Sequence, residues 1–181
     1  PALGKVVEVL GAIDAPGVDT AVIIRKYGLN DAHPAAAIAE ANRLGSTVRE
    51  RDIQGRTDFR EWPTVTIDGE TARDFDDAIS IDRLPNGNCW LGVHIADVSH
   101  YVVEGSALDE EAYERSTSVY FPERAVHMFP HELSTGLCSL NPHVDRLVQS
   151  CLMEVDRRNG QVIRYEMHDG VIHSRERMTY T

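Results

Sequence analysis

The sequence predicts an α+β protein made mostly of an antiparallel sheet with helices. Runs of apolar and β-branched residues of strand length recur along the chain, and two pairs of them flank hairpin-turn signals at residues 85–88 (PNGN) and 159–160 (NG). Only a few segments have helix signals, and they lie between the strands. With 181 residues, of which 42% are apolar and 26% charged, the chain can bury a core.

The first third of the chain is predicted to form two strands, a helix and a linker. Residues 5–10 (KVVEVL) and 20–27 (TAVIIRKY) are apolar and β-branched, which favours strands, and residues 11–19 form a turn region. Residues 33–44 (HPAAAIAEANRL) are rich in alanine, begin near a proline and end before Gly45, which predicts a helix. Residues 46–62 alternate in charge, so we expect a linker and a domain boundary near residues 45–60.

The rest of the chain is predicted to form the main sheet. Residues 64–67, 78–81 and 89–96 have strand patterns, and the last two flank the first hairpin turn. Ser106 and Asp109 resemble a capping box that begins a helix over residues 107–115, and residues 130–137 are predicted as a second short helix. Residues 147–155 and 162–165 flank the second hairpin turn.

Charge and cysteine content narrow the possible function. The chain has 18 basic and 29 acidic residues, a net charge of −11, and residues 61–181 hold all of the excess. On charge alone nucleic acid is a disfavoured partner, unless a cation at an acidic patch changes the balance. Cys89, Cys138 and Cys151 form neither a metal pair nor a disulfide framework, which predicts a reducing, cytoplasmic location. No apolar run is long enough to span a membrane, so no membrane partner is expected.

Residues 66–80 (TIDGETARDFDDAIS) hold the strongest chemical signal. Asp68, Asp74, Asp76 and Asp77 lie within ten residues of one another, and only Arg73 is nearby to offset them. Such crowding raises carboxylate pKa values or requires a cation. Carboxylates with open water positions suit Mg²⁺ bound to a substrate phosphate. A solvated acidic turn explains the same cluster, and a Ca²⁺ loop is a rival although the EF-hand spacing is absent. Spacing alone therefore predicts a divalent-metal site.

The longer motif is similar to a known family. The string IDGETARDFDDAI closely resembles the active-site motif of the ribonuclease II/ribonuclease R (RNB-domain) family of 3′→5′ exoribonucleases, with ribonuclease R the nearer branch. The likeness continues in order through VHIADVSHYV, STSVYFPERAVHMFP, LSTGLCSLNPHVDRL and ERMTYT. Residues 4–27 resemble the tail of a cold-shock-type β-barrel. The resemblance therefore implies two parts: residues 1–45, the end of an OB/cold-shock-like domain plus a helix, and residues 46–181, the N-terminal part of an RNB catalytic domain.

The resemblance implies a function and a set of site residues. It implies processive, Mg²⁺-dependent hydrolysis of single-stranded RNA from the 3′ end, with Mn²⁺ as a substitute cation and nucleoside 5′-monophosphates as products. The motif aspartates Asp68, Asp74, Asp76 and Asp77 would be catalytic, with Asp68 and Asp77 as metal ligands and Asp76 as the most critical carboxylate. Tyr120 would stack on the terminal base. No obligate protein partner is expected.

Two alternatives remain open at this stage. The family's catalytic domain continues past Thr181 and supplies an arginine and further RNA contacts, so we expect the isolated chain to be weakly active or inactive. The chain could then be a catalytically incomplete RNA-binding or regulatory fragment. A Ca²⁺-stabilised structural domain is the second alternative. Arg124 and Arg146 are predicted as phosphate contacts or surface residues, and His127 as a core or surface residue.

Overall fold

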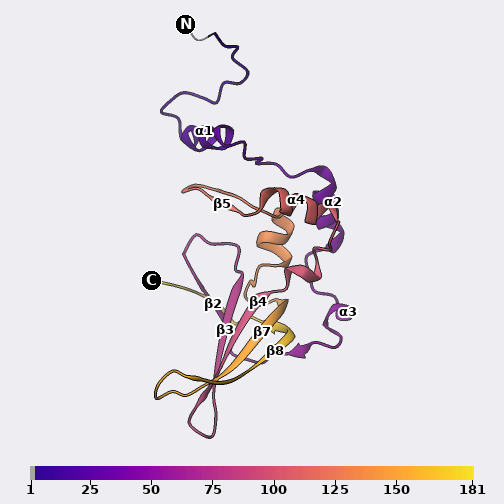
Figure 1. The fold of residues 1–181 in the computed structure, drawn as a ribbon, viewed down its shortest axis with the longest axis vertical. Helices are drawn as coiled ribbons and strands as arrows, with labels where there is room; N and C mark the ends of the chain where they lie inside the picture. Colours follow the sequence, from indigo (N-terminus) through magenta and orange to yellow (C-terminus); the bar gives the residue numbers. More distant parts are fainter. Residues whose placement is uncertain (1–2) are drawn as a thin grey trace.

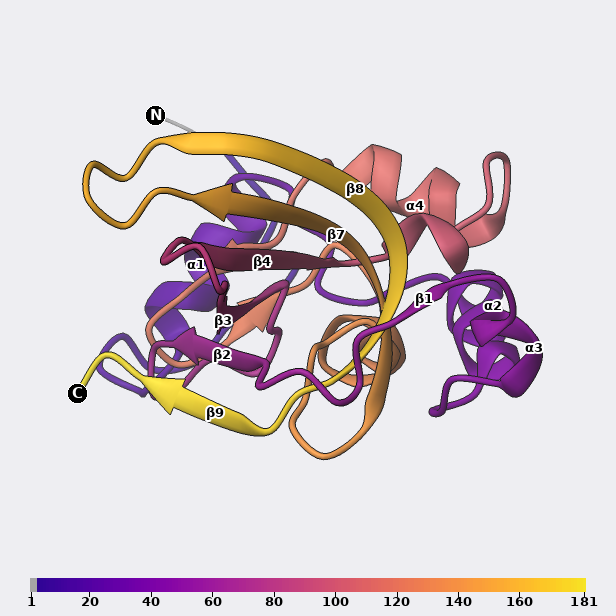
Figure 2. The same cartoon turned by 90° about the horizontal axis from the view of Figure 1, so that it is seen from below.

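A computed structural model describes residues 3–181 and confirms the α+β prediction. The first two residues of the predicted 1–45 unit lie outside the described residues. A seven-stranded, mostly antiparallel sheet has the order β1-β8-β7-β4-β3-β2-β9 (Figure 2). Its strands are β1 (Thr57–Asp58), β2 (Val65–Asp68), β3 (Asp77–Arg83), β4 (Cys89–Ala96), β7 (Asp145–Val155), β8 (Val162–His173) and β9 (Glu176–Thr179). Strands β5 (Val119–Tyr120) and β6 (Ala125–Val126) form a separate hairpin.

Most helices gather at one end of the sheet, as Figure 1 shows. The helices are α1 (Val18–Lys26), α2 (Ala35–Leu44), α3 (Glu50–Ile53), α4 (Ala107–Arg115) and the short turns η1 (Val98–His100) and η2 (Glu132–Leu137). The side chain of Ser106 accepts a hydrogen bond from Asp109 N at 3.2 Å, which confirms the predicted cap of α4. Helix α2 ends before Gly45, whose φ of 83° favours glycine. No helix among residues 3–181 is long and apolar enough to cross a bilayer.

Both predicted hairpins are present. Strands β3 and β4 pair from Asp77↔Ile95 to Arg83↔Cys89, and Gly87 takes a φ of 88° in their turn. Strands β7 and β8 pair along their whole length, and β8 runs much further than the predicted residues 162–165. Two parallel pairs, β1 with β8 and β2 with β9, were not expected from the sequence. The pair of β2 with β9 holds in place residues 68–77, which we call the aspartate segment.

The two strands predicted in the N-terminal part are wrong. Residues 5–10 form no strand, and Val7 and Val9 are 91% and 82% exposed, because no strand lies beside them among the described residues. Residues 18–26 form helix α1 instead of a strand, with Thr20 and Ile24 buried on one side. The four-residue spacing of these two buried positions is helical, and it outweighs the β-branched composition of the segment.

The segment predicted as a linker takes part in the sheet and its core. Residues 46–62 contain α3 and β1, and Phe59 is buried at 2% exposure. Phe59 packs in a core cluster with Phe75, Ala78 and Ile172. A second cluster joins α2, α4 and η2 to the ends of β7 and β8. Both clusters support the end of the sheet where the aspartates lie.

Candidate active site

All four predicted aspartates lie at one end of the β2–β3 pair. Asp68 is the last residue of β2 and Asp77 is the first of β3, and these antiparallel strands bring the two residues to the same end of the sheet. Asp74 and Asp76 lie on the connecting segment, residues 69–76. Asp74 and Asp77 are near enough to act electrostatically on both Asp68 and Asp76. The fold therefore brings the predicted carboxylates together.

Phe75 anchors the connecting segment from within. Its side chain is 4% exposed, and its backbone N–H donates to the hydroxyl of Ser139 at 3.0 Å. The same hydroxyl donates to the carbonyl of Arg73 at 3.0 Å, and Leu140 N donates to the carbonyl of Phe75 at 2.9 Å. Because Phe75 is buried and held on both sides, the aspartates that flank it are fixed in position.

Arg146 supports this anchor from beneath. Its guanidinium donates to the carbonyl of Ser139 at 2.8 Å and to that of Gly136 at 3.1 Å. The residue is only 6% exposed. The prediction of Arg146 as a phosphate contact or surface residue is therefore wrong, since its donors are used inside the protein.

Strand β9 holds the other end of the segment. Arg177 Nη2 donates to the carbonyls of Gly69 and Glu70, each at 2.7 Å, and its guanidinium lies 5.5 Å from the centre of the Phe75 ring. The parallel pairing of β9 with β2 places Thr179 beside Asp68. The turn that follows Asp68 is thus fixed by a strand more than 100 residues later in the chain.

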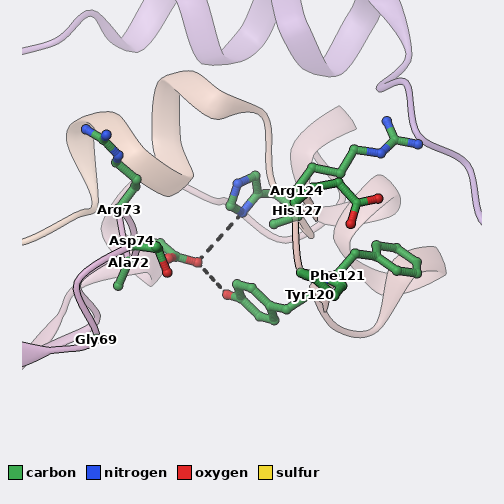
Figure 3. Close-up of a pocket in the computed structure, with 12 residues that line it drawn as sticks. Gly69, Ala72, Arg73, Asp74, Tyr120, Phe121, Arg124 and His127 are labelled. Carbon is green, nitrogen blue, oxygen red and sulfur yellow. Dashed lines mark hydrogen bonds and ion pairs between the residues drawn. The ribbon is translucent and has the colours of Figure 1, made fainter. Parts of the chain in front are cut away.

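Asp74 faces two side chains from the β5–β6 region, as the dashed lines in Figure 3 show. The Tyr120 hydroxyl donates to Asp74 Oδ2, and His127 Nδ1 lies 3.7 Å from the same oxygen. The Tyr120 and His127 rings are perpendicular, with centroids 6.3 Å apart. Burial, followed by the bond to Asp74, raises the pKa of Tyr120 to about 12. Tyr120 nevertheless remains 63% exposed, so its ring is accessible from solvent.

His127 was predicted only as a core or surface residue, and its place beside Asp74 was missed. The signal for it was present, because His127 lies in the same motif block as Tyr120. Together the hairpin and the aspartate segment enclose a cavity of about 390 Å³ lined by Asp74, Tyr120, His127 and Arg124. Arg124 is 3.4 Å from Asp31, so its guanidinium is already paired with a carboxylate.

The electrostatics of the cluster are those of crowded carboxylates. Partial burial, and then the charge of Asp77, raise the pKa of Asp68, while Arg177 acts in the opposite direction. Desolvation, and then the charges of Asp74 and Asp77, raise the pKa of Asp76. Asp76 also lines a cavity of about 280 Å³ whose walls include apolar side chains. Both carboxylates are therefore less stable as anions here than in water.

The donor set fits a hard divalent cation. Asp68 Oδ2 is buried and has no hydrogen-bond partner, although a buried carboxylate oxygen normally has one. No three His, Cys, Asp or Glu side chains in residues 3–181 are grouped closely enough to hold an ion by themselves. Mg²⁺ is commonly bound through one or two carboxylates, with water and substrate phosphate as its other ligands. The pair Asp68 and Asp77 is compatible with that mode of binding.

Comparison with known proteins shows the family to which the chain belongs. Residues 56–181 match the RNB domain and residues 1–34 match a cold shock domain. The predicted boundary between residues 45 and 46 falls between the two matches and stays a prediction. The chain is 53% identical over 178 residues to ribonuclease R of Thermotoga maritima, a match that covers 97% of this chain and 25% of that protein.

Solved structures share the fold. Mycoplasma genitalium RNase R in complex with ribose-methylated single-stranded RNA matches with a TM-score of 0.86 at 33% identity, over 96% of this chain and 27% of that chain. Yeast Ssd1, a pseudonuclease, matches with a TM-score of 0.76 at 20% identity over 94% of this chain and 22% of that chain, which shows the fold alone. The chain spans about a quarter of the length of these proteins. With most of its residues matched by the RNB domain, the chain belongs to the RNB-domain family.

Proposed function

We propose that this chain carries the aspartate site of a 3′→5′ exoribonuclease that hydrolyses single-stranded RNA with Mg²⁺ and releases nucleoside 5′-monophosphates. The observation that carries the proposal is the convergence of Asp68, Asp74, Asp76 and Asp77 at one sheet end, within the RNB domain match. The pKa values of Asp68 and Asp76 are raised there, as is common at catalytic sites. Free cysteines and an RNA substrate fit a cytoplasmic protein.

Asp68 and Asp77 are the residues that would hold Mg²⁺, or Mn²⁺ in its place. The unpartnered Oδ2 of Asp68 is the best available ligand atom, and its raised pKa reflects a charge that a cation would stabilise. When bound, the cation supplies water activation and neutralises charge that develops on the phosphate. It would also offset part of the negative charge that the site presents to RNA.

The other site residues position the substrate and move protons. Asp76 is poised to accept a proton from the attacking water, because its raised pKa makes it a stronger base than an ordinary aspartate. Asp74 holds the Tyr120 hydroxyl, so the Tyr120 ring has a fixed place at the cavity mouth. An exposed aromatic ring can stack on any base, which suits a site that binds the 3′ end of single-stranded RNA.

One observation favours a second candidate function. The pseudonuclease Ssd1 shares this fold, so the fold is compatible with a protein that lacks nuclease turnover. Under this alternative the chain is an RNA-binding or regulatory unit, and its aspartates do not catalyse hydrolysis. The two candidates differ in one measurable property, which is Mg²⁺-dependent loss of 3′-terminal nucleotides.

A chimera tests the proposal. Residues 1–181 replace the matched quarter of Thermotoga maritima ribonuclease R, and 5′-labelled single-stranded RNA is followed with and without Mg²⁺. We expect shortening from the 3′ end and a loss of at least ~10²-fold in rate for Asp76→Asn, because each tenfold corresponds to about 1.36 kcal/mol. Asp82→Asn is the matched control, since Asp82 lies on the same strand but far from the cluster. A folded, RNA-binding chimera with no turnover would support the second candidate instead.

A further inference from the structure

A second cavity lies behind the aspartate segment and has a different character. Its volume is about 450 Å³, and residues from the segment, from η2 and the residues after it, and from β9 line it. The polar and charged members of its wall are Glu70, Arg73, His131, Thr135, Asn141 and Arg177. Figure 3 shows the Arg73 guanidinium directed away from the Asp74 carboxylate. Arg73 lines both this cavity and the first one, so it lies between the two.

The two arginines of this cavity form no close ion pair within residues 3–181, although Arg177 is near enough to Asp68 to lower the pKa of that carboxyl. Neither Arg73 nor Arg177 forms an ion pair there, whereas Arg60 and Arg115 each contact a carboxylate at 2.6 Å. Arg177 Nη2 is used by backbone carbonyls, but its Nε is buried and has no hydrogen-bond partner. A buried donor left unsatisfied costs free energy, which an acceptor in the cavity would recover.

The remaining groups leave the cavity cationic. Glu70 is the acidic side chain in the described wall, and its Oε1 accepts a hydrogen bond from the Thr181 hydroxyl at 2.8 Å. His131 contacts the Thr135 hydroxyl through Nδ1 at 2.8 Å. The wall of the cavity therefore has two guanidinium groups and one carboxylate, in a chain whose net charge is −11. A locally positive cavity on an acidic protein favours an anionic ligand.

We propose that this cavity binds the phosphate group of a nucleotide. Guanidinium groups bind phosphate through paired, charge-assisted hydrogen bonds. Two of them line this cavity, and one has an N–H without a partner. Two sources have this chemistry: a backbone phosphate of bound RNA, and the 5′-phosphate of a released mononucleotide. The proposal deepens the proposed function and rests on it for the choice of nucleotide, because the cavity shares the aspartate segment as a wall.

Binding of the 181-residue chain is measured by calorimetry in EDTA, where hydrolysis cannot interfere. The probes are inorganic phosphate, AMP, adenosine and an oligoadenylate with hydroxyl ends. We expect phosphate and AMP to bind and adenosine not to bind. Arg73→Gln should weaken AMP binding at least about tenfold, and Arg73→Lys should weaken it less. Arg175→Gln is the control, because Arg175 is exposed and lies 3.5 Å from Glu61 outside the cavity.

The outcomes separate the two sources and the two proposals. Displacement of AMP by the oligoadenylate identifies a backbone-phosphate subsite, and binding of AMP alone identifies a product site. AMP that binds no better than adenosine, or Arg73→Gln that binds AMP like the unmodified chain, overturns the proposal. A shift of the Arg177 Nε–H resonance on adding phosphate provides a second readout that needs no variant. Since none of these measurements involves turnover, loss of hydrolysis in the chimera would leave them unaffected.

Discussion

Acid should weaken this fold through one buried histidine beneath the site. His94 is fully buried on β4, where Nε2 lies 2.9 Å from the Ser80 hydroxyl and Nδ1 lies 2.8 Å from the Ser150 hydroxyl. The three residues link β3, β4 and β7 across the sheet. A neutral imidazole can satisfy both hydroxyls, because one ring nitrogen donates and the other accepts. A protonated ring would bury a charge that has no carboxylate beside it.

The size of the effect follows from the shift in pKa. Burial lowers the pKa of His94 to about 4, from an ordinary value near 6.5 in the unfolded chain. Between these two values the unfolded chain binds more protons, so stability falls as the pH falls. A shift of about 2.5 units at 1.36 kcal/mol per unit gives about 3 kcal/mol lost between pH 7.5 and pH 4. Protonation of His94 would therefore destabilise the packing of β3, the strand that begins at Asp77, against β4 and β7.

Urea unfolding at a series of pH values measures this loss. The variant His94→Gln keeps an amide that can reach Ser80 but does not titrate. Between pH 7.5 and pH 4, the free energy of unfolding of the unmodified chain should therefore fall by about 3 kcal/mol more than that of the variant. The difference between the two proteins isolates His94 from the carboxylates that also titrate. His131→Gln, at an exposed histidine, should behave like the unmodified chain. Parallel loss of stability in the unmodified chain and His94→Gln would refute the reasoning.

Two further predictions concern the site and its support. In the chimera, Tyr120→Ala should weaken binding of the 3′-terminal base by about 1–3 kcal/mol and change the length of the final product. The control Tyr113→Ala, on the exposed side of α4, should change neither. A final product of unchanged length in Tyr120→Ala would make Tyr120 a structural residue. Ser139→Ala should cost about 1–3 kcal/mol of stability, because Phe75 N loses its partner in the interior. Ser46→Ala, at an exposed serine, is the control, and equal stability of the two variants would show that this anchor is weak.

Local patterns predicted the elements that depend on local interactions. The hairpin turns, the Ser106 cap and the helix before Gly45 each rest on residues close in sequence, and each is present. The four aspartates lie within ten residues of one another in the sequence, which favoured their grouping in the fold. The roles assigned to these residues came from the family motif and are still predictions.

The elements and residue positions that the sequence analysis predicted wrongly, or did not predict, share a different physical cause. Strands β1 and β9 are short and polar, and they exist because distant strands offer open edges to them. Residues 5–10 have the pattern of a strand, but no strand lies beside them in the described part of the chain, residues 3–181. Arg146 was predicted as a phosphate contact or a surface residue, yet it is buried, because the carbonyls of Ser139 and Gly136 accept hydrogen bonds from its guanidinium. Pairing partners and internal acceptors of this kind are set by the tertiary fold, so single-sequence patterns do not reveal them.

The aspartate segment should bind a divalent cation, and melting of the 181-residue chain with Mg²⁺ tests this most directly. For a millimolar Kd, 20 mM Mg²⁺ should add about 2 kcal/mol, or roughly 5 °C in Tm. Without Mg²⁺, Asp68→Asn should melt higher than the unmodified chain, because the raised pKa of Asp68 means that its charge destabilises the fold. With Mg²⁺ this variant should gain little. A Tm of the unmodified chain that does not respond to Mg²⁺, or an equal response in Asp68→Asn, would contradict a cation site at these aspartates.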